Sequence, residues 1–368
     1  MGGTKAPQAP PLPHDATLFP DRLLDMRIFL LLLLAGLLAP VVRGQDAAVP
    51  TLPEGVTADT VQAIQRGLEF LAREQNKDGS WRSAGGFGTY PVVMSALAGL
   101  ALVAGGSTPE RGPYAKHVRR AVNFCLSQQQ QNGLFAAPAE ESRSMYGHGF
   151  AMLFLSQAYG MEEDLERQRR IRVALERGIV LTAKSQSNDG GWLYTPDANG
   201  DEGSVTVTQV QALRGCRNAG IHVPKETIDH AIKYIERSQN PDGGISYSVR
   251  SRGSRPAITA AACAVLYNAG QYDSKMAGKA FEYAWNNCKP TASSDGHYYY
   301  TQLYMSQACW QKAGKYWAEY YPGIQRMLLR TQGGNGSWNG DGVGLVYGTS
   351  IGLLILQIPF NQLPILSR

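Results

Sequence analysis

Several widespread catalytic signatures are missing from this chain of 368 residues. It has no glycine-rich loop ending in Lys-Ser or Lys-Thr, so a P-loop nucleotide site is excluded. It has no His-Glu-x-x-His pair, so a zinc helix of the metalloprotease type is excluded. A Cys-Gly-Glu-Gln run, which an internal thioester would need, is missing as well. The function must therefore follow from other features of the chain.

Excess charge and paired cysteines are also scarce. The net charge of +5 is small and scattered, which excludes nucleic acid as a partner. The five cysteines are an odd number without any Cys-x-x-Cys spacing, so we predict buried, small apolar side chains. If the protein is exported, one disulfide bond among these cysteines is possible. The hydrophobic content of 43% is enough for a substantial core.

The N-terminal segment predicts an exported protein. Residues 1–25 are rich in proline and indicate disorder or an upstream start site. Residues 26–44 have a charged start, a short apolar run and a small-residue end, as in a secretory signal peptide. The alternative is an uncleaved signal anchor, although the apolar run is shorter than the roughly 20 residues that span a membrane. Residues 45–56 contain two prolines and indicate a linker.

The first clear pattern is Arg66–Trp81. Leu68, Leu71 and Ala72 have the spacing of an amphipathic helix, and Asp78-Gly79 supplies a turn that ends it. Gln75 and Trp81 flank this turn. We expect the glutamine amide to bond free carbonyls of the helix's last turn, and the indole to pack over the turn.

This pattern recurs along the chain. Its glutamine position is occupied by Gln75, Gln129, Gln186, Gln239, Cys288 and Gln332, and a glycine-containing turn follows each position. Between the turns lie more apolar segments, which we predict to be helices at residues 90–104, 145–159, 204–219, 256–269, 298–313 and 346–358.

Each unit therefore pairs a helix with one charged face and a helix that is apolar all round. The first kind is seen at residues 224–237, where Pro224 suits the first helical position. The second kind is seen at residues 256–269 and must be buried on every side. Six such pairs predict an all-α fold with an outer and an inner ring in one domain, residues 57–368.

Arg66-Gly67, Phe70-Leu71 and Gln75 with Gly79-x-Trp81 resemble the QW repeat of squalene and oxidosqualene cyclases and of protein prenyltransferase β-subunits. The resemblance covers about residues 57–358. It implies an α/α toroid whose pocket lies at the N-terminal ends of the inner helices. Periodicity alone would equally allow an open solenoid, so closure of the ring rests on the resemblance.

This sequence lacks the catalytic motifs of the families that it resembles. The resemblance implies an Asp-x-Asp-Asp acid in cyclases, and this chain has none; Asp201 and Glu202, just before an inner helix, are the nearest equivalent. They are our candidate catalytic pair, acting as acids beside a dry cavity. The competing interpretation is a solvated acidic loop that caps the helix.

A zinc site of the prenyltransferase kind is not expected. The relatives' Asp-Gly-Cys-Tyr run is replaced by Asp295-Gly296-His297-Tyr298, and residues 346–350 offer no histidine as third ligand. Because two ligands do not make a zinc site, we expect no metal and no cofactor.

Aromatic and polar residues gather at the predicted starts of the inner helices. They are candidates to line a substrate pocket, because aromatic walls hold polyisoprenoids and stabilise cations. The candidates are Tyr90, Tyr146, His148, His297, Tyr298, Tyr300, Tyr304 and Tyr347. Tyrosine also packs at wet helix ends, and the three consecutive residues Tyr298–Tyr300 cannot all face one way on a helix.

Two hypotheses follow. The first is an exported toroid that binds an isoprenoid or another lipophilic small molecule and cyclises it by acid catalysis, as an isomerase or lyase. The second is a non-catalytic module for a protein or glycan partner outside the cytoplasm, favoured by the loss of both family motifs. A peripheral membrane contact and the oligomeric state stay open. Polysaccharide processing is weaker, because no second acidic pair precedes an inner helix.

Overall fold

The computed structural model describes residues 52–197, 200–291 and 296–367. The predicted disordered segment 1–25, the signal peptide 26–44 and most of the linker lie outside these residues, as does Asp295. Residues from Leu52 onward form one compact unit. The domain boundaries proposed upstream of it stay predictions.

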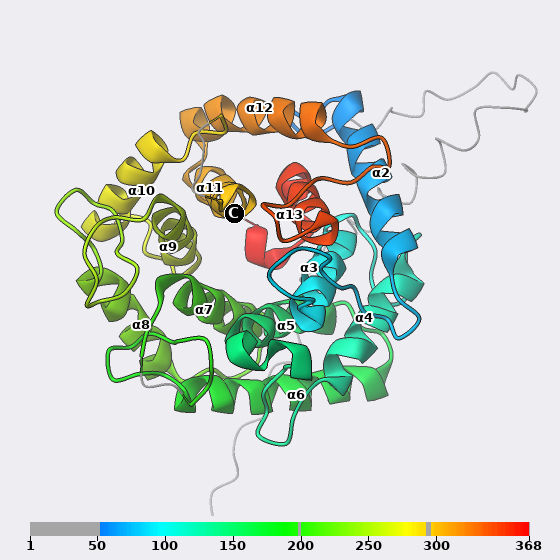
Figure 1. Ribbon diagram of the computed structural model, residues 1–368, viewed down its shortest axis with the longest axis horizontal. Helices are drawn as coiled ribbons and strands as arrows, with labels where there is room; N and C mark the ends of the chain where they lie inside the picture. The colour runs from blue at the N-terminus through cyan, green and yellow to red at the C-terminus, as the bar shows by residue number, and fades with distance from the viewer. Residues whose placement is uncertain (1–51, 198–199, 292–295, 368) are drawn as a thin grey trace, which may run out of the picture. The chain divides into compact units, whose positions relative to one another are not determined.

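The helices that carry a charged face form an outer ring (Figure 1). Their bounds are α2 (Ala58–Glu74), α4 (Ala115–Ser127), α6 (Leu165–Lys184), α8 (Lys225–Arg237), α10 (Lys275–Asn287) and α12 (Gly314–Thr331). Each buries one stripe of side chains and exposes the rest, as amphipathic helices do. Pro224, predicted as the first helical residue, is the N-cap residue of α8, one position before the observed start at Lys225.

The apolar helices lie inside this ring, where neighbours cover them on all sides. Their bounds are α3 (Pro91–Ala104), α5 (Ser144–Tyr159), α7 (Gly203–Asn218), α9 (Pro256–Asn268), α11 (Tyr298–Lys312) and α13 (Leu345–Gln357). All fourteen residues of α3 are buried. The prediction of an α/α toroid is therefore confirmed. Short 3-10 helices precede α5 (η1, Pro138–Arg143) and follow α13 (η2, Ile358–Phe360; η3, Pro364–Leu366).

The recurring glutamines join each turn to the next outer helix. The Gln75 amide donates to the carbonyl of Gly79 in its own turn and to that of His117 in α4, both at 3.0 Å. Gln186 likewise reaches Thr227 in α8, and Gln332 reaches Ala63 in α2. The sequence predicted that the glutamine amide would bond carbonyls in the last turn of its own helix, and this bond does not form. The geometry instead makes the amide a clasp between consecutive outer helices.

The tryptophans satisfy the carbonyl groups at the ends of their own outer helices. The indole N–H groups of Trp81, Trp192 and Trp338 donate to carbonyls ten residues earlier, at 2.7–2.8 Å. These carbonyls lie in the last turns of α2, α6 and α12, where intrahelical donors become scarce. The carbonyl of Leu328 also accepts from the backbone N–H of Gln332. All three indoles are fully buried, so each turn is fixed to the helix that precedes it.

Cys288 occupies the glutamine position after α10, and its thiol contacts the carbonyl of Pro256. Aromatic packing joins α10 to α12 instead. The ring of Tyr316 lies 4.9 Å from that of Phe281 and 5.1 Å from that of Trp285. All five cysteines are buried and free.

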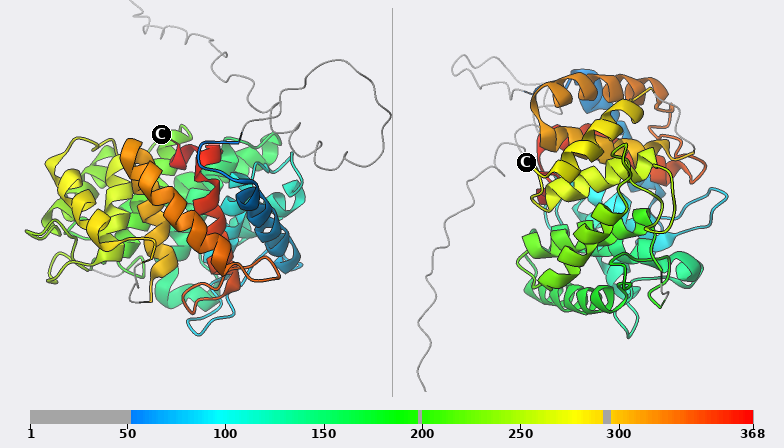
Figure 2. Two further views of the ribbon diagram at one scale, coloured as in Figure 1. Left: turned by 90° about the horizontal axis from the view of Figure 1, so that it is seen from above. Right: turned by 90° about the vertical axis from the view of Figure 1, so that its left-hand side faces the viewer.

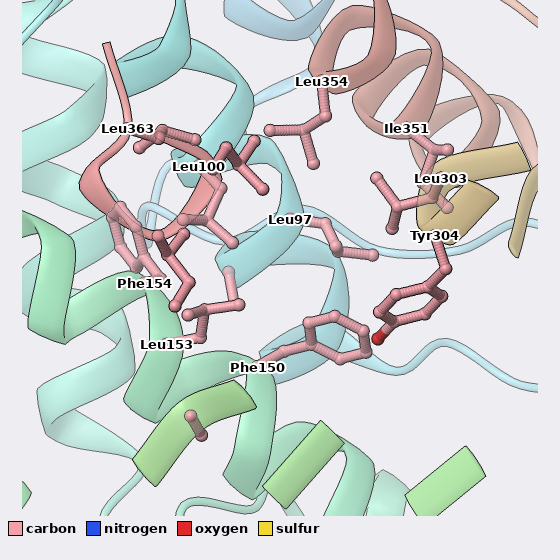
Figure 3. Packing of buried hydrophobic residues seen from close by; sticks show 14 of the residues in the cluster. Leu97, Leu100, Phe150, Leu153, Phe154, Leu303, Tyr304, Ile351, Leu354 and Leu363 are labelled. Atoms are coloured by element: carbon pink, nitrogen blue, oxygen red, sulfur yellow. The ribbon is translucent and has the colours of Figure 1, made fainter. Parts of the chain in front are cut away.

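The two ends of the toroid differ, and the loops that precede α3 and α13 lie at the end opposite the C-terminal segment (Figure 2). That segment closes its own end. The backbone N–H of Ile365 donates to Gln157, and Gln311 donates to the carbonyl of Ser367. Figure 3 shows Leu363 beside Leu100 and Phe154 in the buried cluster.

Within residues 52–197, 200–291 and 296–367, no helix is long and apolar enough to span a membrane.

Candidate functional site

A cavity of about 630 Å³ lies at the N-terminal ends of the inner helices. Its volume is typical of sites for small organic ligands. The inner part is aliphatic, with Val93, Met94, Leu303 and Ile351 in the lining. The aromatic lining residues are Phe87, Tyr90, Tyr146, Phe150, Tyr194, Tyr247, Tyr300 and Tyr347.

Of the candidates named from the sequence, Tyr90, Tyr146, Glu202, His297, Tyr300 and Tyr347 line this cavity. They come from five different inner-helix starts, which the toroid brings together. The structure places the remaining candidates, Asp201, His148, Tyr298 and Tyr304, outside the lining.

His148 is a buried residue that links two parts of the wall. Its Nδ1 accepts from the backbone N–H of Phe135 at 3.2 Å, and its Nε2 lies 2.9 Å from the Thr182 hydroxyl. Burial lowers the pKa of His148 from 6.5 to about 4. The ring is therefore neutral near pH 7, and both of its nitrogens have hydrogen-bond partners. His148 is part of the packing between α5 and α6 and does not line the cavity.

Two of the other outlying candidates, Asp201 and Tyr298, have local hydrogen-bond partners as well. Asp201 accepts from the backbone N–H of Val249 at 3.0 Å, and the Tyr298 hydroxyl donates to the carbonyl of Pro290 at 2.7 Å. Tyr304 is fully buried one turn further along α11 than Tyr300 (Figure 3). Consecutive tyrosines do point in different directions, and Tyr300 is the one that reaches the cavity.

Glu202 is the N-cap residue of α7. Its carboxylate accepts from the backbone N–H groups of Ser204 and Val205 and from the Ser204 hydroxyl, at 2.7–3.0 Å. The Tyr146 hydroxyl lies 3.4 Å away and is 2.5 Å from the Ser204 hydroxyl. Burial raises the pKa of Glu202, and the hydrogen bonds oppose the rise. The carboxylate is therefore engaged with the helix end that it caps.

A second carboxyl group lines the cavity and was not found from the sequence. Asp341 lies in the loop before α13, and its Oδ2 accepts from the backbone N–H of Tyr299 at 2.7 Å, at the start of α11. Burial raises the pKa of Asp341, while the backbone N–H groups of Tyr299 and Tyr298 and the nearby His297 oppose this rise. Asp341 thus has fewer donors than Glu202.

Two residues of the lining have an unusual backbone. Tyr90 and Asp341 have φ values of 38° and 48°, in the left-handed region. Residues other than glycine are uncommon there, although aspartate adopts it more readily than tyrosine does. Such conformations cost free energy and are concentrated at functional sites. The loop of Asp341 is held in place by Val343, whose carbonyl accepts from the backbone N–H of Gly85 at 3.0 Å and from the Ser83 hydroxyl.

Glu140, on η1, repeats the capping arrangement outside the cavity. It is fully buried, and its Oε1 accepts from the backbone N–H groups of Val92 and Val93 at the start of α3. Burial raises its pKa as well. A buried carboxylate at an inner-helix start is therefore also a structural device of this toroid.

Two arginines, Arg143 and Arg255, line the cavity at the starts of α5 and α9. The guanidinium of Arg143 lies 5.1 Å from the ring centre of Tyr194, whose hydroxyl contacts that of Tyr247. No group of three His, Cys, Asp or Glu side chains in residues 52–197, 200–291 and 296–367 could hold a metal ion.

Residues 48–200 match the family model of the squalene-hopene cyclase C-terminal domain. Drimenyl diphosphate synthase from Streptomyces showdoensis is 28% identical over 197 residues, which are 53% of this chain and 34% of that protein. Over these residues the chain is similar to the terpene cyclases. It spans about a third of the length of this curated terpene cyclase, and both matches agree with the resemblance seen in the repeat.

Solved structures support the α/α toroid fold. A variant of the type II terpene cyclase MstE from Scytonema, solved with geranylgeranyl dihydroxybenzoate as substrate, aligns with a TM-score of 0.57 at 15% identity. The alignment covers 83% of this chain and 98% of that one. A D-mannose isomerase aligns with a TM-score of 0.61 at 13% identity, over 84% and 99% of the two chains. At such identities the likeness concerns the fold alone.

Proposed function

We propose that the cavity binds a linear polyisoprenoid and that Asp341 starts its cyclisation by protonating a double bond. The observation that carries the proposal is a partly buried carboxyl group with a raised pKa in the wall of a cavity with an aliphatic inner part. The relation to terpene cyclases supports the substrate class. The neighbour MstE was solved with a geranylgeranyl substrate.

The proposed reaction is a net isomerisation. The Asp341 carboxyl proton forms a C–H bond with the electron pair of a terminal alkene, which leaves a tertiary cation. The electron pair of the next alkene forms a C–C bond to this cation and closes the ring. Loss of a neighbouring proton to the Asp341 carboxylate forms a new alkene and restores the acid.

Asp341 is preferred over Glu202 because of their hydrogen bonds. Donors to a carboxylate stabilise the charged form and engage the oxygens that would carry the proton. Glu202 accepts from two backbone N–H groups and two hydroxyls, whereas Oδ2 of Asp341 accepts from one backbone N–H group. In the proposal, Glu202 holds the start of α7, and Tyr146, Tyr300 and Tyr347 face the cation with their rings.

The second candidate is a binding module without catalysis. It is favoured by the fact that Glu202 and Asp341 both cap helices, as Glu140 does where no cavity is present. A toroid could keep these carboxylates for stability alone.

Asp341→Asn separates the two candidates. Asparagine tolerates the same φ and can still accept from Tyr299, so the fold should be retained. We expect the variant to bind farnesol, squalene or a polyprenyl acid as the unaltered protein does, and to form no cyclic product in gas chromatography with mass spectrometry. Since the reaction needs the protonated acid, the rate should fall as pH rises through the pKa of Asp341. Unaltered protein that binds one of these ligands without forming product would favour the binding module.

We also propose, from the sequence alone, that residues 26–44 direct export. N-terminal sequencing of protein recovered outside the cytoplasm would test the proposal, and recovery of uncleaved protein in a membrane fraction would favour the signal anchor instead.

A further inference from the structure

The entrance of the cavity carries positive charge that its inner part lacks. Arg143 and Arg255 come from different inner-helix starts and are both exposed, and both line the same cavity. In the described residues neither guanidinium forms an ion pair with an aspartate or glutamate, although Arg143 packs against Tyr194.

Glu202, an acidic residue in the wall of the same cavity, already has hydrogen-bond partners. Glu202 lies in the wall close to Tyr194 and Tyr247, but its carboxylate accepts hydrogen bonds from α7 and from Ser204. Some exposed cations elsewhere on this chain have acidic partners, as Arg237 does with Asp189 at 3.1 Å. Arg143 and Arg255 are therefore left to interact with something that enters the cavity.

We propose that Arg143 and Arg255 bind an anionic head group, a phosphate or a carboxylate, of a molecule whose apolar chain occupies the rest of the cavity. This inference rests on the proposed function and narrows it from neutral hydrocarbons to amphiphilic polyisoprenoids. Guanidinium groups match the geometry of both anions through paired N–H donors. The aliphatic residues Met94, Leu303 and Ile351 suit a hydrocarbon chain.

The division of the cavity also orients the ligand. A head group fixed between the two arginines stays at the entrance, near Tyr194 and Tyr247. The apolar chain then extends past Tyr300 and Tyr347 toward the aliphatic part of the wall. The double bonds of the chain, and not the head group, then lie along the apolar wall of the cavity.

Three ligands with one chain test this inference: farnesyl monophosphate, farnesoic acid and farnesol. Their affinities for the full chain would be measured by titration calorimetry at low and moderate salt. We expect both anions to bind about tenfold more tightly than farnesol, and added salt to weaken the anions alone. The ratio of the affinities for farnesyl monophosphate and farnesoic acid identifies the preferred head group.

Arg143→Gln with Arg255→Gln should remove this preference and leave the affinity for farnesol unchanged. Arg252→Gln is the matched control, because Arg252 is exposed in the same loop as Arg255 and does not line the cavity. Circular dichroism would establish that the variants fold.

Equal affinity of the unaltered protein for farnesol and the two anions would overturn the inference and leave the proposed function standing. A preference that persists in the double variant would also overturn it. If none of the three ligands binds, the proposed function fails together with the inference.

Discussion

The side-chain amide of Gln332 donates a hydrogen bond to the backbone carbonyl of Ala63 at a distance of 2.8 Å. Gln332 follows the last outer helix, α12, and Ala63 lies in the first, α2. The same contact joins consecutive helices inside the ring, where Gln75 reaches His117. The first and last outer helices are thus joined by the clasp that links neighbours elsewhere, and the ring is closed.

Gln332→Ala should destabilise the protein at least as much as Gln75→Ala does, because the Gln332 side chain also accepts from the exposed guanidinium of Arg66. Each change removes two hydrogen bonds to backbone carbonyls, so we expect a loss of about 1–2 kcal/mol in the free energy of unfolding. Urea unfolding followed by circular dichroism would measure both. In an open chain of helix pairs Gln332 would keep only the hydrogen bond to Gly336 in its own turn, and Gln332→Ala would then cost clearly less than Gln75→Ala.

Gly336 makes the closest approach at the same junction. Its φ is +90°, and a Cβ there would lie 2.4 Å from the carbonyl oxygen of Arg66. Gly336→Ala should therefore cost about 1–3 kcal/mol by overpacking and backbone strain. Gly334→Ala is the matched control, since a Cβ at Gly334 meets nothing within 4 Å. Equal thermal unfolding temperatures for the two variants would contradict the proposed packing.

His148 should make the stability depend on pH in the acid range. Burial lowers its pKa from 6.5 to about 4, so the unfolded chain takes up a proton before the folded protein does. The folded state should then lose up to about 3 kcal/mol as pH falls from 6.5 toward 4. His148→Asn lacks this contribution, and protonation of the carboxylates affects both proteins alike. The difference between their unfolding free energies, measured across this range, should shrink as pH falls; a constant difference would refute the assignment.

The inner helices could be predicted closely from the sequence. Their predicted starts and ends lie within one residue of the observed bounds, because long apolar runs must be buried and glycines such as Gly105 and Gly220 follow their ends. The same patterns separated inner from outer helices, since an amphipathic helix such as α8 exposes a charged face.

The contacts that individual side chains make with distant parts of the chain could not be predicted from the sequence. Nothing local to Gln75 indicates that its amide reaches the next outer helix, because that contact depends on how two helices pack. Asp341 was missed for the same reason: it stands in a glycine-rich loop, and only the packing of the neighbouring inner helices α11 and α13 brings it to Tyr299. Glu202 and Tyr300 were found because they stand at helix starts, which the toroid gathers around one cavity.

Deuterium incorporation tests the central claim most directly. The unaltered protein and Asp341→Asn would be incubated with farnesyl monophosphate, farnesol and squalene in D₂O, and the extracts analysed by mass spectrometry. The proposal predicts a cyclic isomer carrying one deuterium at the protonated carbon with the unaltered protein, and unreacted substrate with Asp341→Asn. Recovery of only unreacted, unlabelled substrate from the unaltered protein, or the same labelled product from both proteins, would contradict it.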